Sequence, residues 1–168
     1  QLGIVNNGTT REEVVQYYFT TTSPNILPAM KFIKDAARFP VFDENEFASE
    51  KEVVLGELER NMSQPGYYLN QALLEKLFYK YPTRKSPGGS RETVSAATTD
   101  KMRLIQSRYY VPNNSALVVT GDVDPQNIFK LAEQLFGDWA RAADPFKEFP
   151  LVEHPPLTKS EGGIVLQP

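Results

Sequence analysis

The sequence contains no cysteine and only one histidine, His154, among its 168 residues. The lack of cysteine excludes a disulfide-stabilised scaffold and a thiolate metal site. No apolar run approaches the roughly 18 residues that a membrane-spanning helix requires, so we expect no membrane span in this chain. The first ten residues, QLGIVNNGTT, also lack the basic, apolar and small-residue zones of a signal peptide.

The sequence also lacks a strong excess of positive or negative charge. The chain has 18 lysines and arginines against 21 aspartates and glutamates, which gives a net charge of -3. The basic residues are scattered, so the sequence carries no electrostatic signature of a nucleic-acid partner. A hydrophobic content of 40% is typical of a globular chain. Because the sequence starts and stops in the middle of a pattern, we expect it to be a piece of a longer protein.

Proline, glycine and asparagine divide the sequence into short elements. β-Branched and aromatic residues predict a strand at 14–22, and an apolar run predicts another at 115–122. Ile4 and Val5 predict a short strand that ends in an Asn-Gly turn. Apolar residues at helical spacing, with capping residues and proline or glycine stops, predict helices at 25–38, 43–62, 67–80, 100–110 and 125–136.

These elements predict an α+β fold in which helices pack on a mainly antiparallel sheet. We expect one α+β domain over residues 1–140. Residues 141–161 contain four prolines and alternating charge, which is typical of a linker. Residues 162–168 would then be the first strand of a following unit.

The helix predicted at 43–62 carries four glutamates in the stretch EKEVVLGELER. On a helical wheel, Glu50 and Glu57 fall within the arc of apolar residues, one above the other two turns apart. The other two, Glu52 and Glu59, fall on the opposite face. An unpaired carboxylate in an apolar surrounding costs several kcal/mol, so the inward pair predicts a compensating partner. That partner could be a cation such as zinc, a basic side chain, or solvent at the edge of the arc.

Several segments in a fixed order resemble the pitrilysin-like (insulinase) family of zinc metallopeptidases, relatives of mitochondrial processing peptidase. The resemblance extends from Leu2 to Trp139. It rests on NGTT, VVQYYF, AARFPVF, the pair Glu50 and Glu57 with six residues between them, GGSRETVSAATTDKMRLIQSRYYVPNNSALVVTGDVD, and FGDW. The resemblance implies the LuxS/mitochondrial-processing-peptidase-like metallohydrolase fold, as part of the first peptidase domain.

The family binds zinc between an inverted H-x-x-E-H helix and a glutamate on a later helix. The resemblance therefore implies that Glu57 is the third zinc ligand and that Glu50 is its acidic neighbour in catalysis. Two imidazoles and one carboxylate leave a fourth position for a water molecule that attacks a peptide carbonyl. The implied activity is zinc-dependent hydrolysis of peptides or unfolded segments, in a protein that closes on a second peptidase-like half or subunit.

The sequence departs from the family in one important respect, since it contains no H-x-x-E-H motif. His154 lies in the predicted linker and is expected to be solvated. The chain by itself is therefore expected to be inactive and to bind zinc only weakly. Two alternatives stay open: a catalytically silent half or subunit that binds a partner or peptide, and an unrelated α+β binding module with a solvated glutamate pair.

Substrate recognition has a separate candidate near the start of the chain. The stretch Asn7-Gly8-Thr9-Thr10 resembles the Asn-Ala-x-Thr stretch of the family, with glycine in place of alanine. In the family, this stretch lies beside an edge strand that takes up the substrate as an added strand. The resemblance implies that Asn7, Gly8 and Thr9 bind substrate, whereas the sequence alone favours an ordinary Asn-Gly turn.

Overall fold

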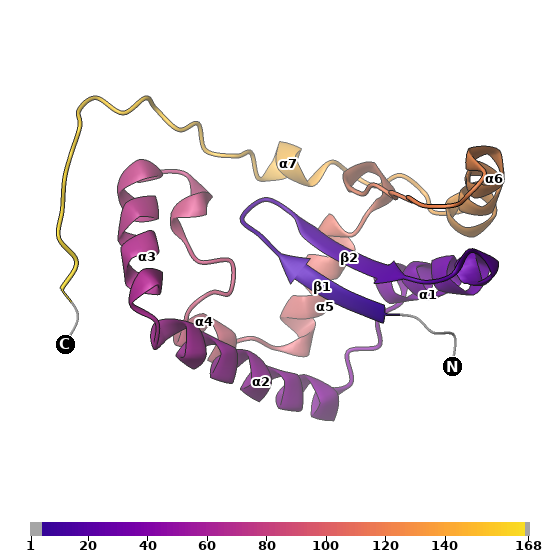
Figure 1. The fold of residues 1–168 in the computed structure, drawn as a ribbon, viewed down its shortest axis with the longest axis horizontal. Helices are drawn as coiled ribbons and strands as arrows, with labels where there is room; N and C mark the ends of the chain where they lie inside the picture. The colour runs from indigo at the N-terminus through magenta and orange to yellow at the C-terminus, as the bar shows by residue number, and fades with distance from the viewer. Residues whose placement is uncertain (1–4, 167–168) are drawn as a thin grey trace. The chain divides into compact units, whose positions relative to one another are not determined.

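The computed structural model describes residues 5–166, apart from the side chain of Arg84. Two strands, β1 (Val5–Thr10) and β2 (Val15–Thr20), form an antiparallel hairpin, and helices make up most of the remaining structure (Figure 1). The fold is α+β, as the sequence predicts. The α-helices are α1 (Ile26–Arg38), α2 (Glu44–Met62), α3 (Pro65–Leu77), α4 (Arg91–Ser95), α5 (Thr99–Tyr109), α6 (Pro125–Phe136) and α7 (Pro145–Glu148). Three short 3-10 helices span Ser23–Asn25, Pro82–Arg84 and Pro112–Asn114.

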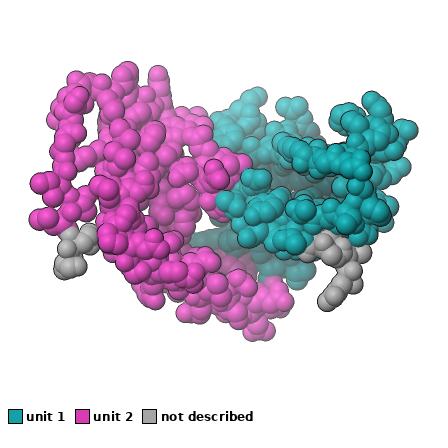
Figure 2. Space-filling view, viewed as in Figure 1, with its two compact units in different colours: residues 1–9, 15–42, 100–148 teal, residues 10–14, 43–99, 149–168 magenta. Residues whose placement is uncertain are grey.

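The chain divides into two compact units (Figure 2). The first unit consists of residues 1–9, 15–42 and 100–148, and so holds most of the hairpin together with α1, α6 and α7. The second unit consists of residues 10–14, 43–99 and 149–168, and holds α2, α3 and α4. The predicted helix α2, with its four glutamates, therefore belongs to the second unit.

Helix α1 provides the buried centre of the first unit. Ala29 and Met30 are the buried residues of the helix, and α1 packs against α6. Phe19 of β2 meets Phe32 of α1 edge to face, with ring centroids 6.3 Å apart. The hairpin is therefore held to α1 through an aromatic contact of the kind that adds about 0.5–1.5 kcal/mol beyond area burial.

The C-terminal ends of α1 and α6 are joined by Arg38. Its Nη1 donates to a carboxylate oxygen of Asp138 at 2.6 Å and to the carbonyl oxygen of Leu135 at 3.3 Å. The guanidinium also lies over the rings of Phe39 and Trp139, at 5.1 and 5.5 Å from their centroids. The Arg38 hydrogen bond and charge lower the pKa of the Asp138 carboxyl below its usual value.

This ion pair predicts an acid-sensitive contribution to stability. A carboxyl with a lowered pKa stabilises the folded state above its unfolded pKa, and the contribution is lost as pH falls through the folded pKa. We expect the thermal unfolding midpoint of wild type to fall more steeply than that of Asp138→Asn as pH drops from about 5 to about 2.5. Equal slopes for the two proteins would contradict a contribution from this pair.

Helix α2 provides the buried residues at the core of the second unit. Leu55 and Leu58 are the buried residues of this helix, and α2 packs against both α3 and α4. Asp43 caps the start of α2, since its Oδ1 accepts from the backbone N–H groups of Asn45 and Glu46 at 2.9 and 3.0 Å. This cap fixes where the glutamate-bearing helix begins.

The helices match the sequence predictions closely, whereas the predicted strand at 115–122 is wrong. Residues 115–122 have no strand structure, and neither do residues 162–166, while residues 167 and 168 lie outside the described part. An isolated strand has no ladder partner for its backbone groups, and the apolar side chains here are open, with Val118 80% exposed. Residues 141–161 are irregular apart from α7.

The hairpin also differs from the prediction at its turn. Asn7 and Gly8 lie inside β1, so the predicted Asn-Gly turn is wrong, and the chain reverses at residues 11–14 instead. Ile4, predicted to start this strand, lies outside the described residues. Within residues 5–166, no helix is long and apolar enough to span a membrane.

Candidate active site

The two candidate glutamates lie on one flank of α2 and not on its buried face. Glu50 and Glu57 are both exposed, and so is Val53 between them, at 54%. The buried face is centred on Leu55 and Leu58, so the predicted apolar arc is rotated relative to the true one. The prediction that the pair faces inward is wrong within the described structure.

Neither of these carboxylates is engaged by a neighbour. Among the described residues, Glu50 and Glu57 have no hydrogen bond and no ion pair. The i, i+7 spacing places them about 10.5 Å apart along the helix axis, on the same side. The described residues also contain no group of three or more His, Asp or Glu side chains that could hold a metal ion. The chain thus offers free carboxylate donors without completing a metal site.

The opposite flank of α2 carries the other two glutamates. Glu52 and Glu59 are both exposed, as predicted. Glu59 nevertheless forms an ion pair with Arg91 at the start of α4. Glu52 has no such partner among the described residues, which makes it the better control for experiments on this helix.

The residues that hold α2 against α4 are not among those predicted from the sequence. Lys51 is half-buried, and its Nζ donates to the carbonyl oxygens of Ser95 and Ala97 at 3.2 and 3.3 Å. Its Nζ also lies 5.6 Å from the centroid of the Phe47 ring. The position of Lys51 next to the apolar arc could have predicted these contacts, because a charged group at such a position needs hydrogen-bond acceptors.

The strand β1 presents an open edge. A Cβ atom at Gly8 would lie 3.3 Å from the ring of Tyr17, so Gly8 lies opposite Tyr17 of β2. Arg11 donates its backbone N–H to the carbonyl of Val14 at 2.9 Å, and antiparallel pairs alternate between hydrogen-bonded and non-hydrogen-bonded. The Gly8–Tyr17 pair lies three residues along the hairpin from the hydrogen-bonded Arg11–Val14 pair, so the alternation makes it a non-hydrogen-bonded pair. The N–H and C=O of Gly8 therefore point away from β2.

The side chain of Asn7 forms a hydrogen bond with the outward N–H of Gly8. Its Oδ1 accepts from the backbone N–H of Gly8 at 2.8 Å. By the same alternation, the backbone of Thr9 faces β2. Asn7, Gly8 and Thr9 thus lie together in β1, within the first unit, whereas Glu50 and Glu57 lie on α2 in the second.

His154 is not the solvated linker residue that the sequence predicts. Its ring packs against Phe78 and Tyr79, with centroid distances of 5.7 and 5.1 Å. Its Nδ1 is buried and has no hydrogen-bond partner among residues 5–166. The imidazole therefore contacts aromatic rings that follow α3, and nothing in the described chain places a carboxylate on it.

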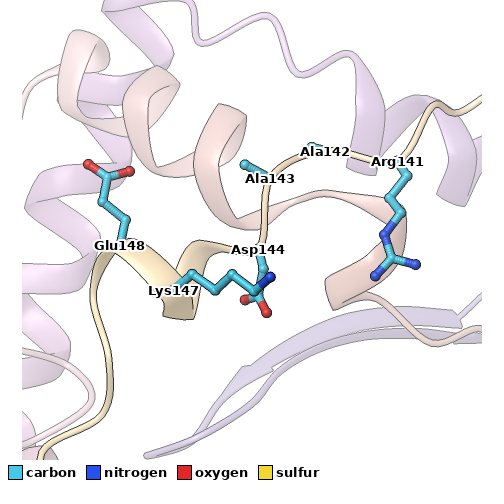
Figure 3. Close-up of a pocket in the computed structure, with 6 residues that line it drawn as sticks. All are labelled: Arg141, Ala142, Ala143, Asp144, Lys147 and Glu148. Atoms are coloured by element: carbon cyan, nitrogen blue, oxygen red, sulfur yellow. The ribbon is translucent and has the colours of Figure 1, made fainter.

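A cavity of about 510 Å³ lies beside α7 in the first unit. Figure 3 shows its lining, which consists of Arg141, Ala142, Ala143, Asp144, Lys147 and Glu148. Asp144 caps the short helix, since its Oδ1 accepts from the N–H of Phe146 at 2.9 Å. The cavity contains none of the residues that the sequence singles out, and its charges of both signs do not select a ligand.

Comparison with known families gives two matches that together cover nearly the whole chain. Residues 1–89 match the model described as insulinase (peptidase family M16). Residues 96–167 match the model described as the peptidase M16 inactive domain. The first of these matches contains β1, β2 and α2, and so all the candidate site residues.

Individual relatives agree with the family models. A protein from Rickettsia bellii described as an uncharacterized zinc protease is 28% identical over 130 residues, covering 77% of this chain and 32% of that protein. The crystal structure of a protease from Helicobacter pylori has a TM-score of 0.78 and 23% identity, covering 85% of this chain and 35% of that one.

A third similar structure is the first half of the periplasmic protease PqqL from Escherichia coli. It has a TM-score of 0.72 and 23% identity, covering 83% of this chain and 31% of that one. The chain spans about a third of the length of the curated relatives it matches.

Proposed function

Because this chain belongs to the insulinase (M16) family of peptidases, we propose that it forms part of a zinc-dependent endopeptidase acting on peptides or unfolded segments. The observation that supports this proposal best is the flank of α2, where Glu50 and Glu57 lie exposed on one side of the helix, without a hydrogen bond or ion pair to any described residue. Carboxylate oxygens are also ordinary zinc ligands.

The residues present fit a zinc site in part. Glu57 would supply one anionic oxygen ligand, and Glu50 would lie on the same flank as a negatively charged neighbour. When bound, zinc would supply an activated water and polarise the peptide carbonyl. A catalytic zinc site needs three protein ligands, so the other two would come from outside the residues described. The 168-residue chain alone would then be inactive.

The edge of β1 is the proposed site of peptide binding. A bound peptide in extended form would pair with the outward N–H and C=O of Gly8 and so add a strand to the hairpin. Asn7 would first have to release the N–H of Gly8, which its side chain accepts in the free state. The Tyr17 ring, which lies close to Gly8, would sit beneath the bound peptide.

A pair of substitutions at Gly8 tests this role of the backbone. Gly8→Pro removes the outward N–H, and proline is tolerated in an edge strand where the N–H does not face the neighbouring strand. Loss of one net hydrogen bond should weaken peptide binding by about 3- to 10-fold. Gly8→Ala adds a Cβ against Tyr17 but keeps the N–H, so it should bind peptide nearly as wild type does.

The readout is peptide affinity, measured beside thermal stability in the full-length protein. Thr9→Pro is a useful contrast, because it removes an N–H that faces β2 and should destabilise the hairpin itself. Equal peptide affinity in folded Gly8→Pro and Gly8→Ala proteins would show that the outer edge of β1 does not bind peptide.

A catalytically silent half or subunit is the second candidate function. The match of residues 96–167 to the M16 inactive domain supports it. The two candidates differ in one simple assay, because a silent protein would bind peptides but would not hydrolyse them when zinc is supplied. Hydrolysis that a chelator stops and zinc restores supports the peptidase.

A further inference from the structure

The packing of α4 against α2 indicates how the candidate carboxylates are held in place. Helix α4 and the loop before it lie alongside α2 in the second unit (Figure 1). We propose that residues 88–97, here called the brace, set the rotation of α2 about its own axis, with Lys51 as a positioning residue for Glu57. The inference rests on the proposed zinc-ligand role of Glu57.

One end of the brace is a close contact of backbone and side chain. A Cβ at Gly88 would lie 3.3 Å from Cδ2 of Leu58, the buried residue that follows Glu57. The next residue, Gly89, has a φ of +77°, and an added Cβ would come within 2.7 Å of Oγ1 of Thr93. Gly89 is therefore needed for the turn into α4, and Gly88 lets the loop come close to Leu58 of α2.

The start of α4 is fixed on both sides. Oγ of Ser90 accepts from the N–H of Thr93 at 3.3 Å, and Oγ1 of Thr93 accepts from the N–H of Ser90 at 2.8 Å, which forms a reciprocal cap. Arg91 then pairs with Glu59 on the flank of α2 opposite to Glu57. Both side chains are more than half exposed, at 59% and 62%, so this ion pair adds little to the stability of the protein. Its role in the brace is to orient α2 relative to α4.

The other end of the brace is held by Lys51. Its ammonium donates to two carbonyls at the C-terminal end of α4, where a positive charge is favoured. Lys51 is the neighbour of Glu50 in sequence, and it lies about two turns before Leu58. Contacts at Lys51, Leu58 and Glu59 thus resist rotation of the helix at two levels along its length.

Rotation matters because the carboxylates lie far from the helix axis. At a radius of about 5–6 Å, a rotation of about 20° moves a side-chain tip by about 2 Å. Metal–ligand distances must agree to within about 0.2 Å. A contact that prevents even a small rotation of α2 would therefore preserve zinc affinity without touching the metal.

The test compares Lys51→Met with Lys51→Arg in the full-length protein. Lys51→Met keeps the side-chain stem but removes the donors to Ser95 and Ala97, so zinc affinity and kcat should each fall about 10- to 100-fold, as for other outer-shell partners. KM should change little, because the proposed peptide-binding site lies on β1 and not on α2. Lys51→Arg restores a donor and should recover much of both quantities. Lys130→Met, at an exposed site on α6, is the matched control and should match wild type.

Zinc affinity is measured by competition with a chelator, and hydrogen exchange of the α2 amides gives a readout that does not depend on activity. Faster exchange in α2 should accompany the loss of zinc affinity. Should Lys51→Met fail to fold, Gly88→Ala displaces Leu58 without removing a hydrogen bond and should lower zinc affinity in the same direction. Folded variants that keep zinc affinity and kcat within about twofold of wild type would overturn the brace.

The outcome for Glu57 separates this inference from the proposed function. If Glu57→Gln loses zinc while Lys51→Met and Gly88→Ala retain it, the brace is wrong and the zinc-ligand role stands. If Glu57→Gln keeps its zinc, the proposed function fails first, and the brace fails with it.

Discussion

Replacing Glu57 by glutamine in the full-length protein should abolish nearly all peptidase activity. A neutral amide is a poor zinc ligand and does not offset the charge of the metal. We expect kcat/KM to fall about 1000-fold or more, which corresponds to a loss of about 4 kcal/mol of transition-state stabilisation. The measurement is hydrolysis of a quenched fluorescent peptide, with zinc supplied in the assay.

The neighbours of Glu57 on α2 serve as internal controls. Glu50→Gln should retain zinc and lower kcat/KM by about 10- to 100-fold, as expected of a charged group beside a metal ligand. Glu52→Gln should be neutral, within about 0.5 kcal/mol in stability, because Glu52 is exposed and has no partner in the described chain. Glu59 is unsuitable as a control, since it pairs with Arg91. Equal activity of the Glu57 and Glu52 variants would contradict the proposed site.

Truncating Met30 should destabilise the protein more than truncating any other side chain in α1. Met30 is 2% exposed and is the largest fully buried side chain of the described residues. Met30→Ala removes buried apolar atoms and leaves a cavity, which typically costs about 2–5 kcal/mol. The measurement is the free energy of unfolding by chemical denaturation, followed by the fluorescence of Trp139.

Leu27 provides the matched control in the same helix. It is 38% exposed, so Leu27→Ala removes less buried area and should cost less than half as much as Met30→Ala. If both variants lost the same free energy of unfolding, Met30 would not be the centre of the first unit.

The sequence predicts local structure well where the signals are themselves local. The cap at Asp43, the stop before Pro40, and the proline that opens α6 all lie within a few residues of the boundaries they determine. The predicted strand at 115–122 fails for the opposite reason. A strand is stabilised by a neighbour that the sequence does not specify locally, and the described structure has none beside these residues.

The orientation of the glutamates in the candidate site also depends on contacts that are distant in sequence. A helical wheel identifies Glu50 and Glu57 as a pair on one side of α2, but it does not fix which side faces the core. That choice depends on Gly88, Ser95 and Ala97, which follow the helix by 26 residues or more and reach Leu58 and Lys51 through tertiary packing. The sequence identifies the pair, and it leaves solvent exposure open as one of three alternatives without selecting it.

The zinc content of the full-length protein tests the central proposal most directly. Wild type and Glu52→Gln should be purified in parallel with Glu57→Gln, dialysed against trace chelator, and analysed for metal by mass spectrometry. We predict stoichiometric zinc in the first two proteins and almost none in Glu57→Gln, with the fold unchanged by circular dichroism. Stoichiometric zinc in a folded Glu57→Gln protein would contradict the proposal that α2 supplies a ligand to the metal.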